Sequence, residues 1–182
     1  MDVLTAIKNR TSYRGKYKDT AIPREDLAKI MEAGLAAPSG CNKQTTSIIA
    51  VDDADVLSKL HEVMELPKAA SAPALICVLS QKIIAYKDGA GLDRCYAIHD
   101  YSAAIENMLL AIVSLGYESC WYEGHVTDAD AIGRKMADVL GVPAEYDLVC
   151  LLPVGVADQP VRYAEKKPFE ERAWFNGFRN AT

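Results

Sequence analysis

Apolar residues recur along this chain with two different spacings, and the spacing of three or four residues predicts its helices. This pattern is typical of helices that bury one face. It predicts helices over residues 2–9, 23–35, 53–64 and 128–140, with Thr127 as the N-cap of the last. The longest helix, residues 94–115, is apolar around nearly its whole circumference and ends at Gly116. We expect it to be buried by the rest of the domain or by a second subunit.

Continuous apolar and β-branched runs predict the strands. The run at residues 72–80 is apolar on both faces, which indicates a central strand, and runs at 45–51 and 146–156 predict two more. Pro153 marks the end or an edge of the last strand, because proline cannot donate to a ladder. Residues 117–124 form a strand-to-loop element, and the polar residues 81–93 form an exposed connection that could border an active site.

An arginine-rich stretch follows the first helix. Thr11 and Tyr13 favour extended backbone, in which residues two apart point to the same side. Arg10, Ser12 and Arg14 would therefore line one side with two guanidinium groups and a hydroxyl. This array fits a phosphate, since arginine offers a planar fork of donors. The alternative is a solvated basic strip on the surface.

A polar loop follows the second helix, because Pro38 and Gly40 do not continue a helix. Ser39, Asn42 and Gln44 then provide donors and acceptors that suit the edge of a flat heterocycle. The alternative is a helix-ending turn with no ligand. His99–Asp100 in the long helix is expected to make a local polar contact, although a proton relay is the other interpretation.

Composition and charge limit the classes of function. The chain has 182 residues, enough for the single domain (1–182) that we expect, and half of them are hydrophobic. Its net charge of −5 argues against nucleic acid or an anionic membrane as partner. No apolar run approaches membrane-spanning length and the N-terminus lacks a signal-peptide pattern, so the expected location is the cytoplasm. The five cysteines contain no C-x-x-C pair, which argues against zinc or a disulfide framework. Neither a dinucleotide fingerprint nor a Walker A sequence occurs.

The C-terminal tail, residues 157–182, is polar and yet carries Trp174, Phe175 and Phe178. Such aromatic side chains need a surface to cover. The tail is expected either to wrap over a neighbouring subunit or to pack back on its own domain.

Together these segments resemble the FMN-dependent nitroreductase family, over residues 2 to 178 and in family order. The resemblance rests on Arg10-Thr11-Ser12-Tyr13-Arg14 (R-x-S-x-R), Ala37–Gln44 (A-P-S-x-x-N-x-Q), Gly116–Gly124, Leu151–Gly155 and Lys166-Lys167-Pro168. Thr45 and Thr46 follow Gln44, where many members have proline and tryptophan, which leaves the substrate preference open.

The resemblance implies an α+β fold, in which a mostly antiparallel sheet and flanking helices surround the long central helix. It also implies a homodimer with two FMN sites at its interface and a C-terminal tail on the partner. The phosphate would be held by Arg10, Ser12, Arg14 and Lys166. The rings or ribityl chain would meet Pro38, Ser39, Asn42 and Gln44, and the backbone of Tyr122, Glu123 and Gly124 would lie beside the rings.

The implied activity is a ping-pong oxidoreductase reaction. NADH or NADPH would reduce FMN and leave, and a nitroaromatic, quinone or related small acceptor would then take two electrons. FMN carries this chemistry, so no catalytic side chain and no metal are expected. Cys41 is interpreted as a small loop residue rather than a redox partner. Two alternatives stay open: a non-catalytic FMN storage or sensing protein, and a helical dimerising protein without cofactor.

Overall fold

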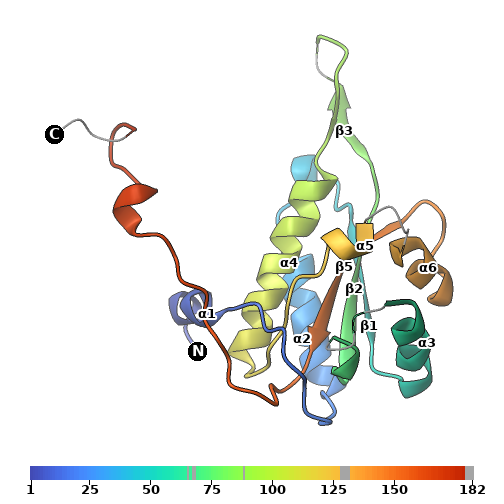
Figure 1. Ribbon diagram of the computed structural model, residues 1–182. Coiled ribbons are helices and arrows are strands. Elements are labelled where there is room, and N and C mark those ends of the chain that lie inside the picture. Colours follow the sequence, from blue (N-terminus) through green and yellow to red (C-terminus); the bar gives the residue numbers. More distant parts are fainter. Residues whose placement is uncertain (65, 67–68, 88, 128–131, 179–182) are drawn as a thin grey trace.

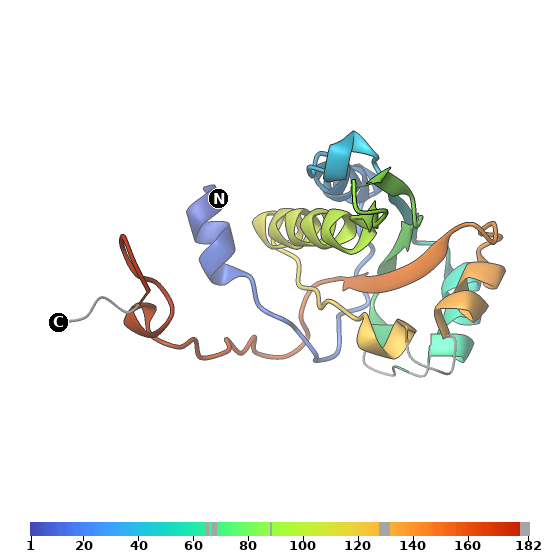
Figure 2. The ribbon, with the colours of Figure 1, turned by 90° about the horizontal axis from the view of Figure 1, so that it is seen from above.

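The computed structural model describes residues 1–64, 66, 69–87, 89–127 and 132–178. A three-stranded antiparallel sheet lies at its centre, in the order β1-β2-β5 (Figure 1). Its strands are β1 (Thr46–Val51), β2 (Ala74–Ser80) and β5 (Asp147–Val154). One face is covered by α2 (Arg24–Leu35) and α4 (Ala97–Ser114), and the other by α3 (Ala54–Met64), α5 (Gly124–Thr127) and α6 (Ile132–Val139) (Figure 2). This α+β arrangement is the predicted fold class.

The central position of β2 confirms the prediction from its apolar run. Every residue of β2 is buried. Ile76 and Val78 pack in the core on the α2 and α4 side, whereas Leu75 and Cys77 pack on the α3 and α6 side. Because strand side chains alternate between faces, a strand buried on both faces must be apolar throughout.

Strand β5 is an edge of this sheet, as Pro153 predicted. Residues 117–122 run along its outer side but make only isolated bridges, Glu118 to Gly155 and Tyr122 to Leu151. The pairing of β5 with β2 changes register where Val78 faces Cys150 and Leu79 faces Leu148, so Val149 is an inserted residue. The inserted residue is a β-bulge, which locally bends a strand and re-aims its side chains.

The predicted helices and strands agree with the structure to within a few residues, but three details were wrong. Residues 81–93 are not a plain loop, because Ile84–Lys87 (β3) and Asp93–Cys95 (β4) pair as a hairpin. For the same reason the long helix begins at Ala97, not at residue 94. Thr127 is not an N-cap: it ends α5, and its Oγ1 donates to the carbonyl of Glu123. Residues 128–131 lie outside the described residues.

One side of α4 is open in the single chain, although the helix is apolar nearly all round. Ala104, Ile105 and Met108 are buried, whereas the side chain of Ile98 is 66% exposed. Gly116 ends the helix in the left-handed conformation, with φ of 88°, as predicted. The open side therefore offers apolar surface that a second chain could cover.

Both ends of the chain carry exposed apolar side chains. Helix α1 (Val3–Asn9) is capped by Asp2, whose Oδ1 accepts from the Thr5 amide at 3.1 Å, and it exposes most of its apolar residues. The tail leaves the body of the molecule and runs past α1 (Figures 1 and 2). The exposed side chains of the tail include Tyr163, Phe169, Phe175 and Phe178. The start of the tail packs back on its own domain, where Ala157 and Val161 lie against Tyr13 and Tyr17, whereas these four aromatic side chains further along remain exposed.

The described helices include none that is both long and apolar enough to span a membrane.

Candidate functional site

The arginine segment, Arg10–Arg14, has the extended backbone that its sequence predicts. Helix α1 ends at Asn9, and the backbone then turns to an extended conformation with φ of −63° and ψ of 125° at Arg10. Side chains alternate across this backbone, so that one side packs inward and the other opens outward. The inner side chains are the buried Thr11 and Tyr13, and the outer ones are Arg10, Ser12 and Arg14.

Hydrogen bonds to distant residues fix the arginine segment, among them one from the Gln159 backbone amide to the Tyr13 hydroxyl at 3.2 Å. The Tyr13 amide donates to the carbonyl of Ser119 at 2.8 Å. The Thr11 hydroxyl donates to the carbonyl of Arg162, at the start of the tail, at 3.1 Å. The segment therefore lies between the strand-to-loop element and the tail.

The outer side of the segment faces Cys120 and Tyr122. Burial raises the pKa of the Cys120 thiol, and the neighbouring Arg14, Ser12 and Arg10 oppose this rise. Burial likewise raises the pKa of Tyr122 to about 12, against the charge of Arg14. Both groups are therefore protonated and uncharged near neutral pH, so they do not neutralise the guanidinium groups.

An acidic residue reaches only one of the two arginines. The Arg10 Nε lies 3.5 Å from the Glu106 Oε1 on α4, whereas Arg14 makes no ion pair with any described residue. The positive charge of Arg14 is therefore not neutralised by a described acidic residue, and the Ser12 hydroxyl offers a further hydrogen-bond donor beside it. This is the electrostatic arrangement that a phosphate requires.

The amide loop, Pro38–Gln44, has a strained backbone. Cys41, Asn42 and Gln44 have positive φ angles of 51°, 52° and 49°. Such angles are uncommon outside glycine, although asparagine tolerates them better than most residues. Only one short 3-10 turn, η1 (Gly40–Asn42), is regular here. A loop of this kind keeps its shape only when its surroundings hold it.

Asp100 on α4 is the group that holds the amide loop. Its Oδ1 accepts from the Gly40 amide and its Oδ2 accepts from the Thr45 hydroxyl, both at 2.7 Å. The Asp100 side chain is buried, with 4% of the residue exposed. Within the loop, the Ser39 Oγ accepts from the Gln44 amide at 3.0 Å. The predicted local polar contact at His99–Asp100 is wrong in one respect: Asp100 does make polar contacts, but with Gly40 and Thr45, which are 60 and 55 residues away in the sequence.

Gly40 also has a steric role. A Cβ atom at this position would lie 2.4 Å from the ring of Tyr96, which precedes α4. Any side chain there would push the loop away from the start of the helix. Beneath the loop lies a cavity of about 210 Å³ lined by Pro38, Ser39, Gln44, Thr46 and Asp100 among others. The Thr46 hydroxyl is buried without a hydrogen-bond partner in the described part of the chain.

The third predicted segment, Tyr122–Gly124, is fixed by its side chain as well as its backbone. The Glu123 carboxylate accepts from the Tyr101 hydroxyl at 2.6 Å and from the Trp121 Nε1 at 2.8 Å. The Tyr122 amide and carbonyl both pair with Leu151. The Glu123 carbonyl also accepts from the backbone of Val126 and Thr127, so that both its side chain and its carbonyl have partners within the chain, and its backbone N–H and the backbone of Gly124 remain for a ligand.

One chain brings together only part of the predicted site. The arginine segment lies beside Cys120 and Tyr122, and Tyr122 leads into Glu123 and Gly124. The amide loop is attached instead to the first turn of α4, and no hydrogen bond or ion pair between described residues joins it to the arginine segment. Lys166 lies further along the exposed tail and makes no ion pair with another described residue.

Two residues that sequence reasoning did not assign to the site support it from α4. Asp100 accepts a hydrogen bond from the amide loop, and the neighbouring Tyr101 donates one to the Glu123 carboxylate. The available signal was an acidic residue in the first turn of a largely apolar helix, because a carboxylate that becomes buried needs partners. Its partners lie 55 and 60 residues away in the sequence and could not be inferred from it.

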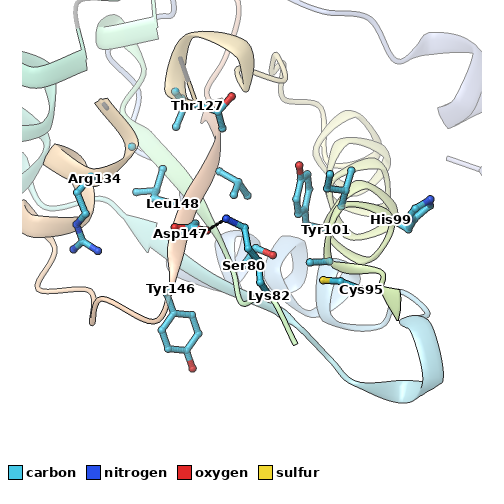
Figure 3. Close-up of a pocket in the computed structure, with 15 residues that line it drawn as sticks. Ser80, Lys82, Cys95, His99, Tyr101, Thr127, Arg134, Tyr146, Asp147 and Leu148 are labelled. Atoms are coloured by element: carbon cyan, nitrogen blue, oxygen red, sulfur yellow. Dashed lines mark ion pairs between the residues drawn. The ribbon is translucent and has the colours of Figure 1, made fainter. Parts of the chain in front are cut away.

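A second and larger cavity, of about 560 Å³, is lined in part by Tyr101 (Figure 3). It is enclosed by the start of α4, the ends of β2 and β5, and parts of α5 and α6. No residue that the sequence assigned to the cofactor site lines it.

Comparison with known proteins identifies the family. The model of the nitroreductase family matches residues 7–66 and 57–156. The chain therefore belongs to the nitroreductase family, which is a family of oxidoreductases.

Relatives and solved structures agree with this assignment. A protein of Archaeoglobus fulgidus named NADH dehydrogenase/NAD(P)H nitroreductase is 32% identical over 158 residues, covering 85% of this chain and 84% of the relative. A protein of the same name from Methanothermobacter thermautotrophicus is 34% identical over 122 residues, covering 66% of this chain and 60% of the relative. A nitroreductase of Bacteroides fragilis solved with bound FMN has a TM-score of 0.74 at 29% identity, covering 97% of this chain and all of the other.

Proposed function

We propose that this protein is an FMN-dependent NAD(P)H oxidoreductase that passes two electrons to a nitroaromatic, a quinone or a related small acceptor. The observation that carries the proposal is the cluster of Arg10, Ser12 and Arg14 beside uncharged groups at Cys120 and Tyr122. The cluster suits a phosphate monoester, and the segment beyond Tyr122 leads directly to the residues assigned to the flavin rings. The FMN bound to the related Bacteroides structure supports the choice of mononucleotide.

The residues present fit FMN by their chemistry. Arg14 has no acidic partner among the described residues, so a phosphate would supply its missing charge. Ser12 would donate to the same group or to the ribityl chain. The amide side chains of Asn42 and Gln44 each offer a donor and an acceptor for the edge of the rings. The strained loop presents them in fixed directions, which lowers the entropic cost of binding.

The separation of the amide loop from the arginine segment supports a homodimer. In the proposed assembly the loop of one chain meets the arginine segment of its partner, so that each of two FMN sites lies between subunits. The exposed apolar residues of α1, the open side of α4 and the aromatic tail supply the surface for this interface. Lys166, in the tail, would then form an ion pair with the phosphate.

In the proposed mechanism the chain binds and orients, and FMN when bound supplies the two-electron chemistry. The backbone of Glu123 and Gly124 would lie along the rings, held in place by the bonds from Tyr101 and Trp121 to the Glu123 carboxylate. NADH or NADPH and the acceptor would occupy the same place in turn. No side chain has to form a covalent intermediate.

The first prediction concerns turnover itself. Mixing the FMN-loaded protein with NADH or NADPH in the absence of oxygen should bleach the flavin absorbance near 450 nm, on the order of seconds or faster for a working enzyme. A subsequent addition of menadione should restore the absorbance. A protein that binds FMN and never bleaches with either nicotinamide would instead be the storage or sensing protein that forms the alternative.

The second prediction concerns Arg14. The Arg14→Ala variant should lose about tenfold to a hundredfold in FMN affinity, because a charged hydrogen bond contributes roughly 1.5–3 kcal/mol. Titration followed by quenching of flavin fluorescence measures this change. Lys16→Ala is the matched control, since it removes a neighbouring exposed cation outside the segment. Equal affinity in both variants would remove Arg14 from the site.

The third prediction concerns the tail. A variant that ends after Arg162 keeps the bond from Thr11 but lacks the aromatic residues. If the tail covers a partner, this variant should dissociate to monomers at micromolar concentration in analytical ultracentrifugation. A truncated protein that stays a stable dimer and binds FMN normally would show that the tail does not hold the assembly together.

A further inference from the structure

The larger cavity contains a buried hydroxyl group without a partner. Ser80, the last residue of β2, is 3% exposed, and its Oγ has no hydrogen-bond partner among the described residues. Ser80 lines the cavity of about 560 Å³. Buried polar groups are hydrogen-bonded in nearly all folded proteins, so an exception inside a cavity points to a missing bound group.

The direction of the Ser80 side chain follows from strand alternation. Ile76 and Val78 pack on the α2 and α4 side of the sheet, and Ser80 continues this series at every second residue. Tyr101 belongs to the same cluster and also lines the cavity. The hydroxyl therefore lies on the side of the sheet where α4 begins.

The edge of β5 explains why the cavity is there. The last bridge on the outer side of β5 joins Tyr122 to Leu151, and the strand begins four residues earlier at Asp147. This first part of β5 pairs with β2 on its inner side, but no described strand lies on its outer side, and Asp147, Leu148 and Val149 line the cavity. Val149 is the inserted residue of the bulge. The cavity is thus a gap left where strand pairing stops.

The charges around the cavity are already paired. The Lys82 Nζ lies 3.1 Å from the Asp147 Oδ2 (Figure 3). Arg134 donates to the Asp138 Oδ1 at 2.7 Å and to the Val142 carbonyl at 2.8 Å. An ionic ligand would have to break one of these pairs, so the cavity favours a neutral one.

The remaining walls are apolar and aromatic. They include Ala97, Leu148 and Val149 together with the rings of Tyr101 and Tyr146. Figure 3 shows His99 pointing away from the other labelled side chains, so its imidazole adds no charge to the interior. The volume lies within the range of small-molecule sites, roughly 300–1,000 Å³.

We propose that this cavity is a second ligand site, which takes a neutral, flat and mostly apolar molecule with one carbonyl or hydroxyl group bonded to the Ser80 Oγ. The site is separate from the proposed FMN site and does not depend on it. The two meet at Tyr101, whose ring lines the cavity while its hydroxyl holds the Glu123 carboxylate, and at Val126 and Thr127, which line the cavity and donate to the Glu123 carbonyl. A bound molecule would therefore contact the residue that positions the flavin-facing segment.

Coumarin is a suitable probe, because it is neutral, flat and carries one carbonyl acceptor. Calorimetric titration of the full chain, both alone and saturated with FMN, should show one coumarin bound per chain in both states. Ser80→Ala should weaken binding about threefold to tenfold, as expected for one lost neutral hydrogen bond. Ala97→Phe, which fills the cavity from the first turn of α4, should abolish it, with folding checked by circular dichroism.

Thr46→Ala is the matched control. Thr46 pairs with Ser80 across β1 and β2, and its hydroxyl is also unpartnered, but it lines the smaller cavity. This variant should bind coumarin like the unmodified protein. The proposal is overturned if coumarin does not bind at its solubility limit, if Ser80→Ala and Thr46→Ala bind equally, or if FMN competes with coumarin.

Discussion

The amide loop depends on one buried carboxylate. Cys41, Asn42 and Gln44 adopt left-handed backbone that costs each non-glycine residue on the order of 1 kcal/mol or more. Asp100 accepts from the loop backbone at Gly40 and from Thr45, and hydrogen bonds to a charged group contribute about 1.5–3 kcal/mol each. The two bonds are thus of the size needed to offset the strain. Without these two bonds the loop would relax from its left-handed backbone, and its amide side chains would no longer point in fixed directions.

The same helix organises the other two segments of the site. Asp100 reaches the amide loop, Tyr101 reaches Glu123, and Glu106 reaches Arg10. One rigid helix packed against the sheet can therefore set the relative positions of three segments that are far apart in the sequence. Its partners lie on different sides of the helix, so a single chain holds the amide loop apart from the arginine segment, and this separation supports the proposed site between two chains.

The sequence predicted the elements well because their signals are local. The apolar run of β2 and the alternation around Ser12 follow directly from strand geometry, and the structure has both. The hairpin at Ile84–Cys95 was missed because nearly all residues of its two strands are exposed, the apolar Ile84 and Tyr86 among them, so burial imposes no alternating pattern on them. Thr127 was misassigned because an N-cap signal cannot be told from a side chain that bonds back within a preceding turn. Asp100 was identifiable as unusual, but its partners depend on tertiary contacts.

The central claim is that Asp100 fixes the amide loop for its ligand. Hydrogen exchange of the Asp100→Ala variant, measured by mass spectrometry, tests this claim most directly. Asp147→Ala is the control, because it also removes a carboxylate, but one whose ion pair with Lys82 is exposed. We predict faster exchange confined to residues 39–45, unchanged exchange in β2, and weaker FMN binding than in the control. Exchange at residues 39–45 equal to that of the unmodified protein would contradict the account.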